Sequence, residues 1–143
     1  MRIDLHHVNL TAPDPVPLAR FYRDVVGFSD VTDTWGRENR IPEQYGAPIA
    51  FVEDAGGRQL HLSTAAPDLL FTTGREINMV GPRGHIAFRV DDIGELERRL
   101  DAAGVPYSDY GEWAIRGWHQ VFVNDPMGNV IEFHQVIGRP RGA

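Results

Sequence analysis

Residues 7–10, which read His-Val-Asn-Leu, lead into an apolar-periodic segment that ends at Gly27. Residues 85–88, which read His-Ile-Ala-Phe, lead into a similar segment that ends at Gly104. The spacing is constant, because 85 − 7, 92 − 14 and 96 − 18 all give 78 for a histidine, an aspartate and a leucine. Two copies of one unit that both begin with a strand histidine predict two halves facing each other across a pseudo-twofold site.

The composition restricts the chemistry. A chain of 143 residues forms one domain, or two small halves that share a core. The net charge of −6 argues against a nucleic-acid partner. The absence of cysteine excludes disulfides and zinc–thiolate sites, and the absence of lysine excludes Schiff-base chemistry. No apolar run approaches the roughly 18 residues of a membrane span and no signal-peptide pattern opens the chain, so we expect a cytoplasmic protein without a membrane partner.

Two helices are predicted from apolar residues at helical spacing. The first begins after the N-cap residue Asp14 and ends at Gly27. Its apolar stripe consists of Leu18, Phe21, Tyr22, Val25 and Val26. The second begins after Asp92, with Glu95 spaced as in a capping box, and ends at Gly104.

Alternating apolar and polar residues predict the strands. They are expected at 48–53, 58–63, 85–90, 118–124 and 129–136, with weaker ones at about 28–34 and 106–113 and a loop at 35–47. Each half then has the order β-α-β-β-β, which makes the protein an α+β fold. The predicted single domain divides into module one at 3–64, a connection at 65–84, module two at 85–136 and a tail at 137–143.

One face of the predicted sheet is rich in polar side chains: His7, Asn9, Gln59, His61, Ser63, His85, Arg89, Glu132 and His134. His7 and His85 open the two halves, whereas His61 and Glu132 lie in the last strand of each half. Imidazole and carboxylate ligands without thiolate suit one divalent ion, namely Zn, Ni, Co, Mn or Fe(II). Because His6 and His7 are adjacent, we expect only one of them to face the site, and the repeat selects His7.

Four stretches together resemble the vicinal oxygen chelate superfamily, which includes glyoxalase I, methylmalonyl-CoA epimerase, extradiol dioxygenases and the fosfomycin- and bleomycin-resistance proteins. These stretches are residues 7–10, 21–28 (FYRDVVGF), 85–92 (HIAFRVDD) and 124–133 (NDPMGNVIEF). The resemblance implies two βαβββ modules that form a U-shaped mixed sheet around a central metal site, with helices on the outer face. It also implies a small-molecule substrate and a homodimer.

The resemblance places metal ligands at His7, His85 and Glu132. The fourth ligand position of the isomerases and lyases falls on His61, where the glyoxalase and epimerase patterns have Glu or Gln. His61 can therefore be a ligand, or it can hydrogen-bond the substrate or another ligand.

Other side chains are candidates for proton transfer and substrate binding. Glu132 or a metal-bound hydroxide is the first candidate for moving a proton, and His134 is the second. His134 can otherwise lie in the outer coordination shell or at the mouth of the cavity. The predicted substrate-binding residues are Asn9, Arg89, Trp113 and Trp118. The two tryptophans can equally well pack in the core or in a dimer interface. Arg89 can instead lie at an exposed strand end.

The expected function is the first of three, and the second and third are its alternatives. The first is a glyoxalase- or epimerase-like lyase or isomerase in which the metal binds two neighbouring substrate oxygens and stabilises an enolate. The second is a non-haem Fe(II) extradiol dioxygenase, and the third is a drug- or metabolite-binding resistance protein without catalysis. The ligand count separates the first two: a fourth ligand at His61 favours the redox-neutral enzyme, and three ligands favour the dioxygenase, which needs an additional open position for O₂.

Overall fold

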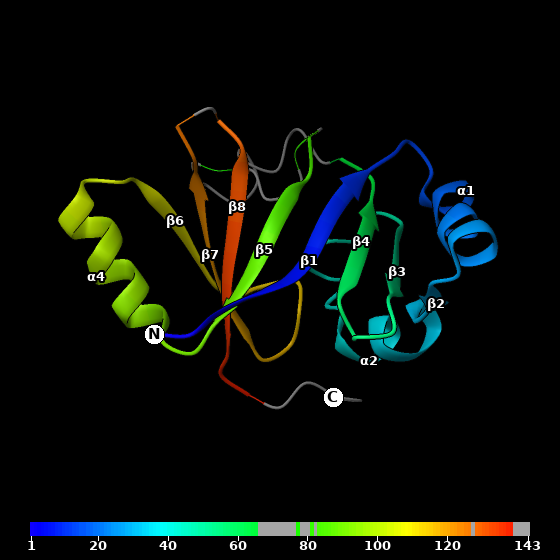
Figure 1. The fold of residues 1–143 in the computed structure, drawn as a ribbon, viewed down its shortest axis with the longest axis horizontal. Coiled ribbons are helices and arrows are strands. Elements are labelled where there is room, and N and C mark those ends of the chain that lie inside the picture. The colour runs from blue at the N-terminus through cyan, green and yellow to red at the C-terminus, as the bar shows by residue number, and fades with distance from the viewer. Residues whose placement is uncertain (66–76, 78–80, 82, 127, 139–143) are drawn as a thin grey trace.

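A computed structural model describes residues 1–65, 77, 81, 83–126 and 128–138. Eight strands form one mixed sheet in the order β2-β3-β4-β1-β5-β8-β7-β6 (Figure 1). The strands are β1 (Ile3–Thr11), β2 (Ser29–Asp30), β3 (Ile49–Glu53), β4 (Gln59–Ser63), β5 (His85–Val90), β6 (Tyr107–Glu112), β7 (Trp118–Asn124) and β8 (Val130–Val136).

The strand order repeats on both sides of the centre. β1 pairs in parallel with β4, and β5 pairs in parallel with β8, whereas β1 and β5 are antiparallel and join the halves. Read outward from this junction, one side runs β1, β4, β3, β2 and the other runs β5, β8, β7, β6. Each position thus has its equivalent in the other half, which confirms the predicted pair of βαβββ modules.

The helix of the second half forms as predicted. α4 (Ile93–Ala103) begins at Asp92, whose side chain accepts a hydrogen bond from the Glu95 N–H. It ends at Gly104, whose φ of 68° is left-handed. The Glu95 carboxylate accepts hydrogen bonds from Arg98 and Arg99, so it stabilises the exposed face of the helix.

The helix of the first half differs from the prediction after its first turns. Asp14 caps α1 (Pro15–Arg20) as expected, but residues 21–26 continue as a π-helix, η1 (Phe21–Val26). Hydrogen bonds from i to i+5 widen the turn, so an apolar stripe at 3.6-residue spacing no longer stays on one side. Three residues of the apolar stripe, Phe21, Val25 and Val26, are therefore exposed.

The segment after η1 also differs from the prediction. The strand expected at 28–34 is only the two-residue β2, and the expected loop at 35–47 contains the end of η2 (Thr32–Gly36) and the short α2 (Arg37–Asn39). The Asp30 side chain accepts a hydrogen bond from the Thr32 N–H, which turns the chain out of the sheet. The other predicted strands agree with the observed ones to within about a residue.

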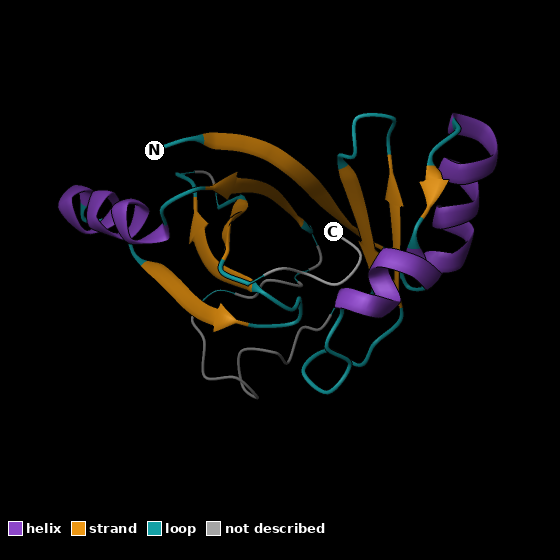
Figure 2. Ribbon diagram, turned by 90° about the horizontal axis from the view of Figure 1, so that it is seen from below, coloured by secondary structure: helices purple, strands orange, loops and turns teal. Residues whose placement is uncertain are grey.

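The two faces of the sheet have different chemistry. α1 packs on a cluster that contains Ala50, Val52 and Leu62, and α4 packs on a cluster that contains Val90 and Val121. Both helices lie outside the curved sheet, near its two ends (Figures 1 and 2). The opposite, inner face therefore carries the polar residues. No helix within the described ranges is long and apolar enough to cross a bilayer.

Most of the predicted connection at 65–84, and residues 139–143 of the predicted tail, lie outside the described residues.

Candidate metal centre

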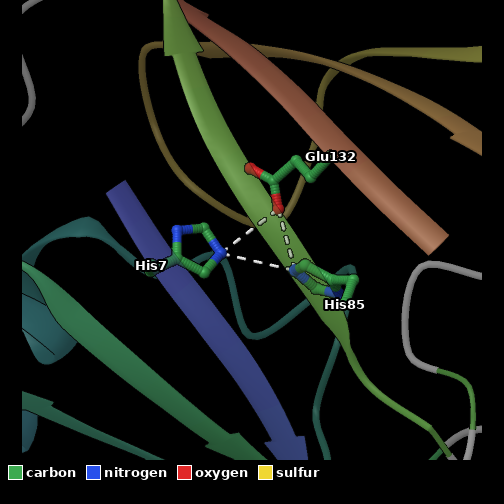
Figure 3. A group of neighbouring side chains, drawn as sticks. All are labelled: His7, His85 and Glu132. Carbon is green, nitrogen blue, oxygen red and sulfur yellow. Dashed lines mark hydrogen bonds and ion pairs between the residues drawn. The ribbon is translucent and has the colours of Figure 1, made fainter. Parts of the chain in front are cut away.

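Three side chains from both halves meet at the β1–β5 junction (Figure 3). The Nε2 atoms of His7 and His85 are 3.3 Å apart, and the Oε2 atom of Glu132 lies 3.3 Å from the first and 2.9 Å from the second. All three side chains are buried. His7 comes from β1, His85 from β5 and Glu132 from β8, so a single chain supplies the whole group.

The spacing of these three atoms fits a divalent ion. Ligand atoms at right angles around an ion with bonds of about 2.1 Å lie roughly 3.0 Å apart, close to the three observed separations of 2.9–3.3 Å. Two imidazoles and one carboxylate on one side of an ion form the two-histidine, one-carboxylate arrangement known from non-haem iron sites. His7, His85 and Glu132 are thus suited to hold one divalent metal.

The protonation states also suit a metal. Burial is the main cause that lowers the pKa of His7 from 6.5 to about 4, so its ring is neutral at neutral pH and one of its nitrogens has a lone pair for a metal. Burial opposes ionisation of Glu132, but the surrounding histidines, with His7 and His134 foremost, hold its pKa well below the usual range. The site thus offers a neutral imidazole and an ionised carboxylate without losing protons first.

A chain of hydrogen bonds fixes the orientation of Glu132. The Arg89 Nε–H can only donate, and its partner at 3.2 Å is Nε2 of His134. The proton of neutral His134 is therefore on Nδ1, which donates to Oε1 of Glu132 at 2.9 Å. The His134 ring also stacks on Trp118 at 3.9 Å between centroids. Arg89 and His134 thus hold one carboxylate oxygen and leave Oε2 to the histidine pair.

His6 also faces the site, so the prediction that only one of His6 and His7 does so is wrong. The pairing register of β1 with β5 shifts between Leu5 and His7, and this β-bulge interrupts the alternation of side chains. The Nδ1 atoms of His6 and His7 are 3.0 Å apart. Because His7 presents Nε2 to the other ligands, its proton belongs on Nδ1, which donates to His6.

His61 lies beside the three ligands, but its nitrogen is turned away from them. Its ring stacks on His7 with 3.7 Å between centroids, and its Nε2 lies 2.8 Å from Oε1 of Gln59. Burial is the main cause that lowers the pKa of His61 well below 6.5, so the ring is neutral. The described structure therefore brings three of the four predicted ligands together.

A small cavity of about 40 Å³ adjoins the ligands. Its lining is mostly polar, with Ile49, Ala114 and Ile115 as its aliphatic part; the polar or amphipathic side chains are Asn9, Tyr45, His61, Ser63, His85, Gln120 and Glu132. The amide of Asn9 and the hydroxyl of Ser63 are hydrogen-bonded to each other at 3.0–3.1 Å. Asn9 thus lines the cavity as predicted, although its side-chain amide is already engaged.

A larger hollow of about 670 Å³ lies on the side of the site where His6 is found. Arg89 and Trp118, both predicted to bind substrate, line it together with Trp35. The Arg89 guanidinium carbon lies 5.4 Å from the centroid of Trp118, which is a cation–π distance. This hollow thus combines one cationic group with aromatic walls.

Two side chains lie away from these cavities. Trp113 is part of a core cluster with Tyr110 and Phe122, so its location matches the packing alternative. His119 lies on the other face of β7, and its Nε2 is 2.7 Å from Oδ1 of Asp109.

The sequence interpretation missed three residues of the site. Gln120 had a usable signal, since alternation along β7 places it on the same face as Trp118. Trp35 was assigned to a loop, and a contact across the fold brings its ring 6.0 Å from that of His61. His6 was missed because nothing in the local sequence reveals the bulge.

A family model described as Glyoxalase/Bleomycin resistance protein/Dioxygenase superfamily matches residues 4–133. The chain belongs to this superfamily. No curated protein sequence matches it. The solved structures that this fold resembles include an epimerase and a dioxygenase.

Three solved structures with the same fold share about a fifth of their residues with this chain. A hypothetical protein from Bacillus halodurans C-125 has 20% identity and a TM-score of 0.69, over 99% of this chain and 100% of that one. Methylmalonyl-CoA epimerase from Mycobacterium tuberculosis has 20% identity and a TM-score of 0.66, over 92% and 86%. The halotolerant catechol dioxygenase BphC has 19% identity and a TM-score of 0.60, over 92% and 39%. At these identities the glyoxalase superfamily fold is what the proteins share.

Proposed function

We propose that this chain is a metal-dependent enzyme that binds two neighbouring oxygens of a small substrate, and that it is a non-haem Fe(II) ring-cleaving dioxygenase. One observation carries the choice: three ligand atoms lie 2.9–3.3 Å from one another, while Nε2 of His61 faces Gln59. Three protein ligands leave three positions on a six-coordinate ion, enough for two substrate oxygens and O₂. When bound, Fe(II) would supply the electron transfer that O₂ activation requires.

The protein's own residues have separate tasks in this proposal. His7, His85 and Glu132 hold the metal. His61 lines the small cavity. Because Oε1 of Gln59 can only accept, Nε2 of His61 carries the ring proton, and Nδ1 keeps the lone pair that can accept the proton of a chelating hydroxyl. His134 has both ring nitrogens engaged, by Arg89 and by Glu132, and is therefore assigned to positioning Glu132 instead of to proton transfer.

The substrate-binding groups are those that line the two cavities. Asn9 contributes to the wall of the small cavity beside the ligands. Arg89 and Trp118 would receive an aromatic or anionic part of the substrate in the larger hollow. Trp113 is left out of the proposal because its ring packs in the core.

A redox-neutral lyase or isomerase of the glyoxalase or epimerase kind is the second candidate. It is favoured by the position of His61, which lines the same cavity and stacks directly on His7. A rotation of its ring away from Gln59 would make it a fourth ligand, leaving two positions for a bidentate substrate.

The deciding experiment compares the wild type with His61→Ala, with His119→Ala as a control remote from the site. Each purified protein is reconstituted anaerobically with Fe(II), and metal content and O₂ uptake with catechols are measured. We expect all three proteins to bind one Fe(II) and His61→Ala alone to lose catechol-dependent O₂ uptake.

Loss of metal from His61→Ala, with no O₂ uptake by the wild type, would instead support the four-ligand lyase or isomerase. If the wild type binds no divalent metal after reconstitution, both enzymatic proposals fail and a binding protein without catalysis remains.

A further inference from the structure

Gln120 on β7 presents a buried acceptor at the small cavity. Its side chain is 1% exposed, and its Nε2 donates to Oε1 of Glu132 at 3.3 Å. Its Oε1 has no hydrogen-bond partner among the described residues. A buried carbonyl oxygen without a partner is uncommon in folded proteins, and a ligand is one explanation for it.

The neighbouring carboxylate determines which way the amide of Gln120 points. An ionised carboxylate only accepts hydrogen bonds, and Oε1 of Glu132 already accepts one from Nδ1 of His134. The amide NH₂ must therefore face Glu132, because the reverse orientation would place two acceptors against each other. This leaves the amide oxygen of Gln120 as the group that requires a donor.

The rest of the cavity does not supply that donor. The Asn9 amide and the Ser63 hydroxyl are bonded to each other, and Nε2 of His61 is engaged by Gln59. The Tyr45 hydroxyl donates to the backbone oxygen of Thr64, and Nε2 of His85 faces Glu132. The other lining residues, Ile49, Ala114 and Ile115, are apolar. A donor for Gln120 must then arrive with whatever occupies the cavity beside the metal ligands.

We infer that Gln120 is a specificity-determining residue that accepts a hydrogen bond from an O–H or N–H group of the metal-chelating substrate. This inference rests on the proposed chelating function and narrows its substrate class. Ligands that keep a proton on or beside a chelating oxygen, such as catechols or hydroxamates, satisfy Gln120. Fully ionised dicarboxylates leave it unpaired. Sites that are built to hydrogen-bond a substrate group discriminate strongly against analogues that lack it.

The test uses Zn(II)-loaded protein, so that no redox chemistry occurs, and two chelating probes measured by calorimetry and absorbance. 4-Nitrocatechol retains an O–H donor at neutral pH, whereas oxalate has none. In Gln120→Met, which keeps the length of the side chain without its acceptor, we expect 4-nitrocatechol to bind about 10- to 100-fold more weakly. Because Gln120 also donates to the ligand Glu132, both probes are measured at saturating Zn(II), and the affinity for oxalate should fall less than the affinity for 4-nitrocatechol. Gln120→Leu repeats the test with a different shape.

The other outcomes refute either the role of Gln120 alone or the proposed chelating function as well. If both variants bind the two probes as the wild type does, or lose both equally, the role of Gln120 is refuted while chelation by the wild type stands. If a metal-bound water were the donor to Gln120 instead of the probe, the affinities for the two probes would fall equally. If neither probe binds the zinc-loaded wild type more tightly than the metal-free protein, the chelating function itself is refuted together with this inference.

Discussion

Glu132 uses its two carboxylate oxygens for different purposes. Oε2 faces the two histidine ligands, whereas Oε1 accepts hydrogen bonds from His134 and Gln120. A carboxylate held in this way loses little orientational freedom when it binds an ion, because the neighbouring side chains have already restricted its rotation.

Arg89 and His134 should therefore control metal affinity without touching the metal. We expect His134→Phe and Arg89→Gln each to weaken Zn(II) binding by roughly 10- to 100-fold, because outer-shell partners of metal ligands have effects of this size. The measurement is competition calorimetry with a chelator. Arg98→Gln, on the exposed face of α4, is the matched control. Unchanged zinc affinity in both site variants would contradict the proposed role of the hydrogen-bond chain.

The buried histidines make stability depend on pH. Burial is the main cause that lowers the pKa of His7 to about 4 and that of His6 to about 2. Such histidines bind fewer protons when folded than when unfolded, so protonation favours unfolding. Their contribution is complete above about pH 6.5, the unfolded value, and is lost as the pH falls toward the folded value.

For the metal-free protein we expect the free energy of unfolding to drop by about 2 kcal/mol between pH 7.5 and 5.0 from His7 alone. His6 and His61 should add to the drop. Urea unfolding at the two pH values measures it, and His6→Asn should reduce the difference. A free energy that stays constant over this interval would mean that the histidines are not desolvated in the folded state.

At the scale of elements, Gly84 sets how closely β5 approaches β1. Its φ is +66°, and a Cβ atom built there would lie 1.9 Å from the backbone oxygen of Asn9. Gly57, in the turn between β3 and β4, has a similar φ of +80° with nothing within 4 Å of a Cβ. The two glycines share the backbone conformation and differ in the space around them.

Gly57→Ala should then cost on the order of 1–2 kcal/mol, the penalty of a left-handed residue with a side chain. Gly84→Ala should cost about 3–5 kcal/mol, because the junction must also open. Chemical unfolding of the two variants gives the comparison. If the two variants lose the same free energy of unfolding, β1 and β5 can move apart at Gly84 without loss of stability.

Elements with strong local signals were predictable, and elements set by contacts across the fold were not. Asp92 and Gly104 mark the ends of α4 by themselves, and alternation locates β5, β7 and β8 within about a residue. The π-helical turn of η1 and the bulge at His6 have no comparable signal in the local sequence, because each depends on how its segment pairs or packs in the fold.

At the scale of the whole molecule, the repeat predicted the two modules, and the family resemblance added the U-shaped sheet and the candidate metal ligands. Equivalent positions in two modules bring His7 and His85 together, and β8 adds Glu132. The state of His61 was not predictable, since a hydrogen bond to Gln59 and a stacking contact with His7 decide where its nitrogen points.

The exposed apolar residues of η1 bear on assembly. Phe21, Val25 and Val26 are 49%, 72% and 53% exposed. Apolar side chains gathered on one element of a surface often mark a protein contact, and we expect this chain to form a homodimer. Sedimentation at micromolar concentration should give twice the chain mass, and Val25→Asp should shift the protein toward the monomer. A monomeric wild type would refute the expectation.

The junction of β1 with β5 has a mechanical consequence. An ion held by His7, His85 and Glu132 would bind to strands from both halves of the molecule. It would therefore cross-link the two modules at the β1–β5 pair, where they are joined. Metal binding would then raise the local stability most in the central strands β1 and β5 and least in the outer strands β2 and β6. Hydrogen exchange of the central amides should slow on zinc binding, while the sheet margins exchange as before.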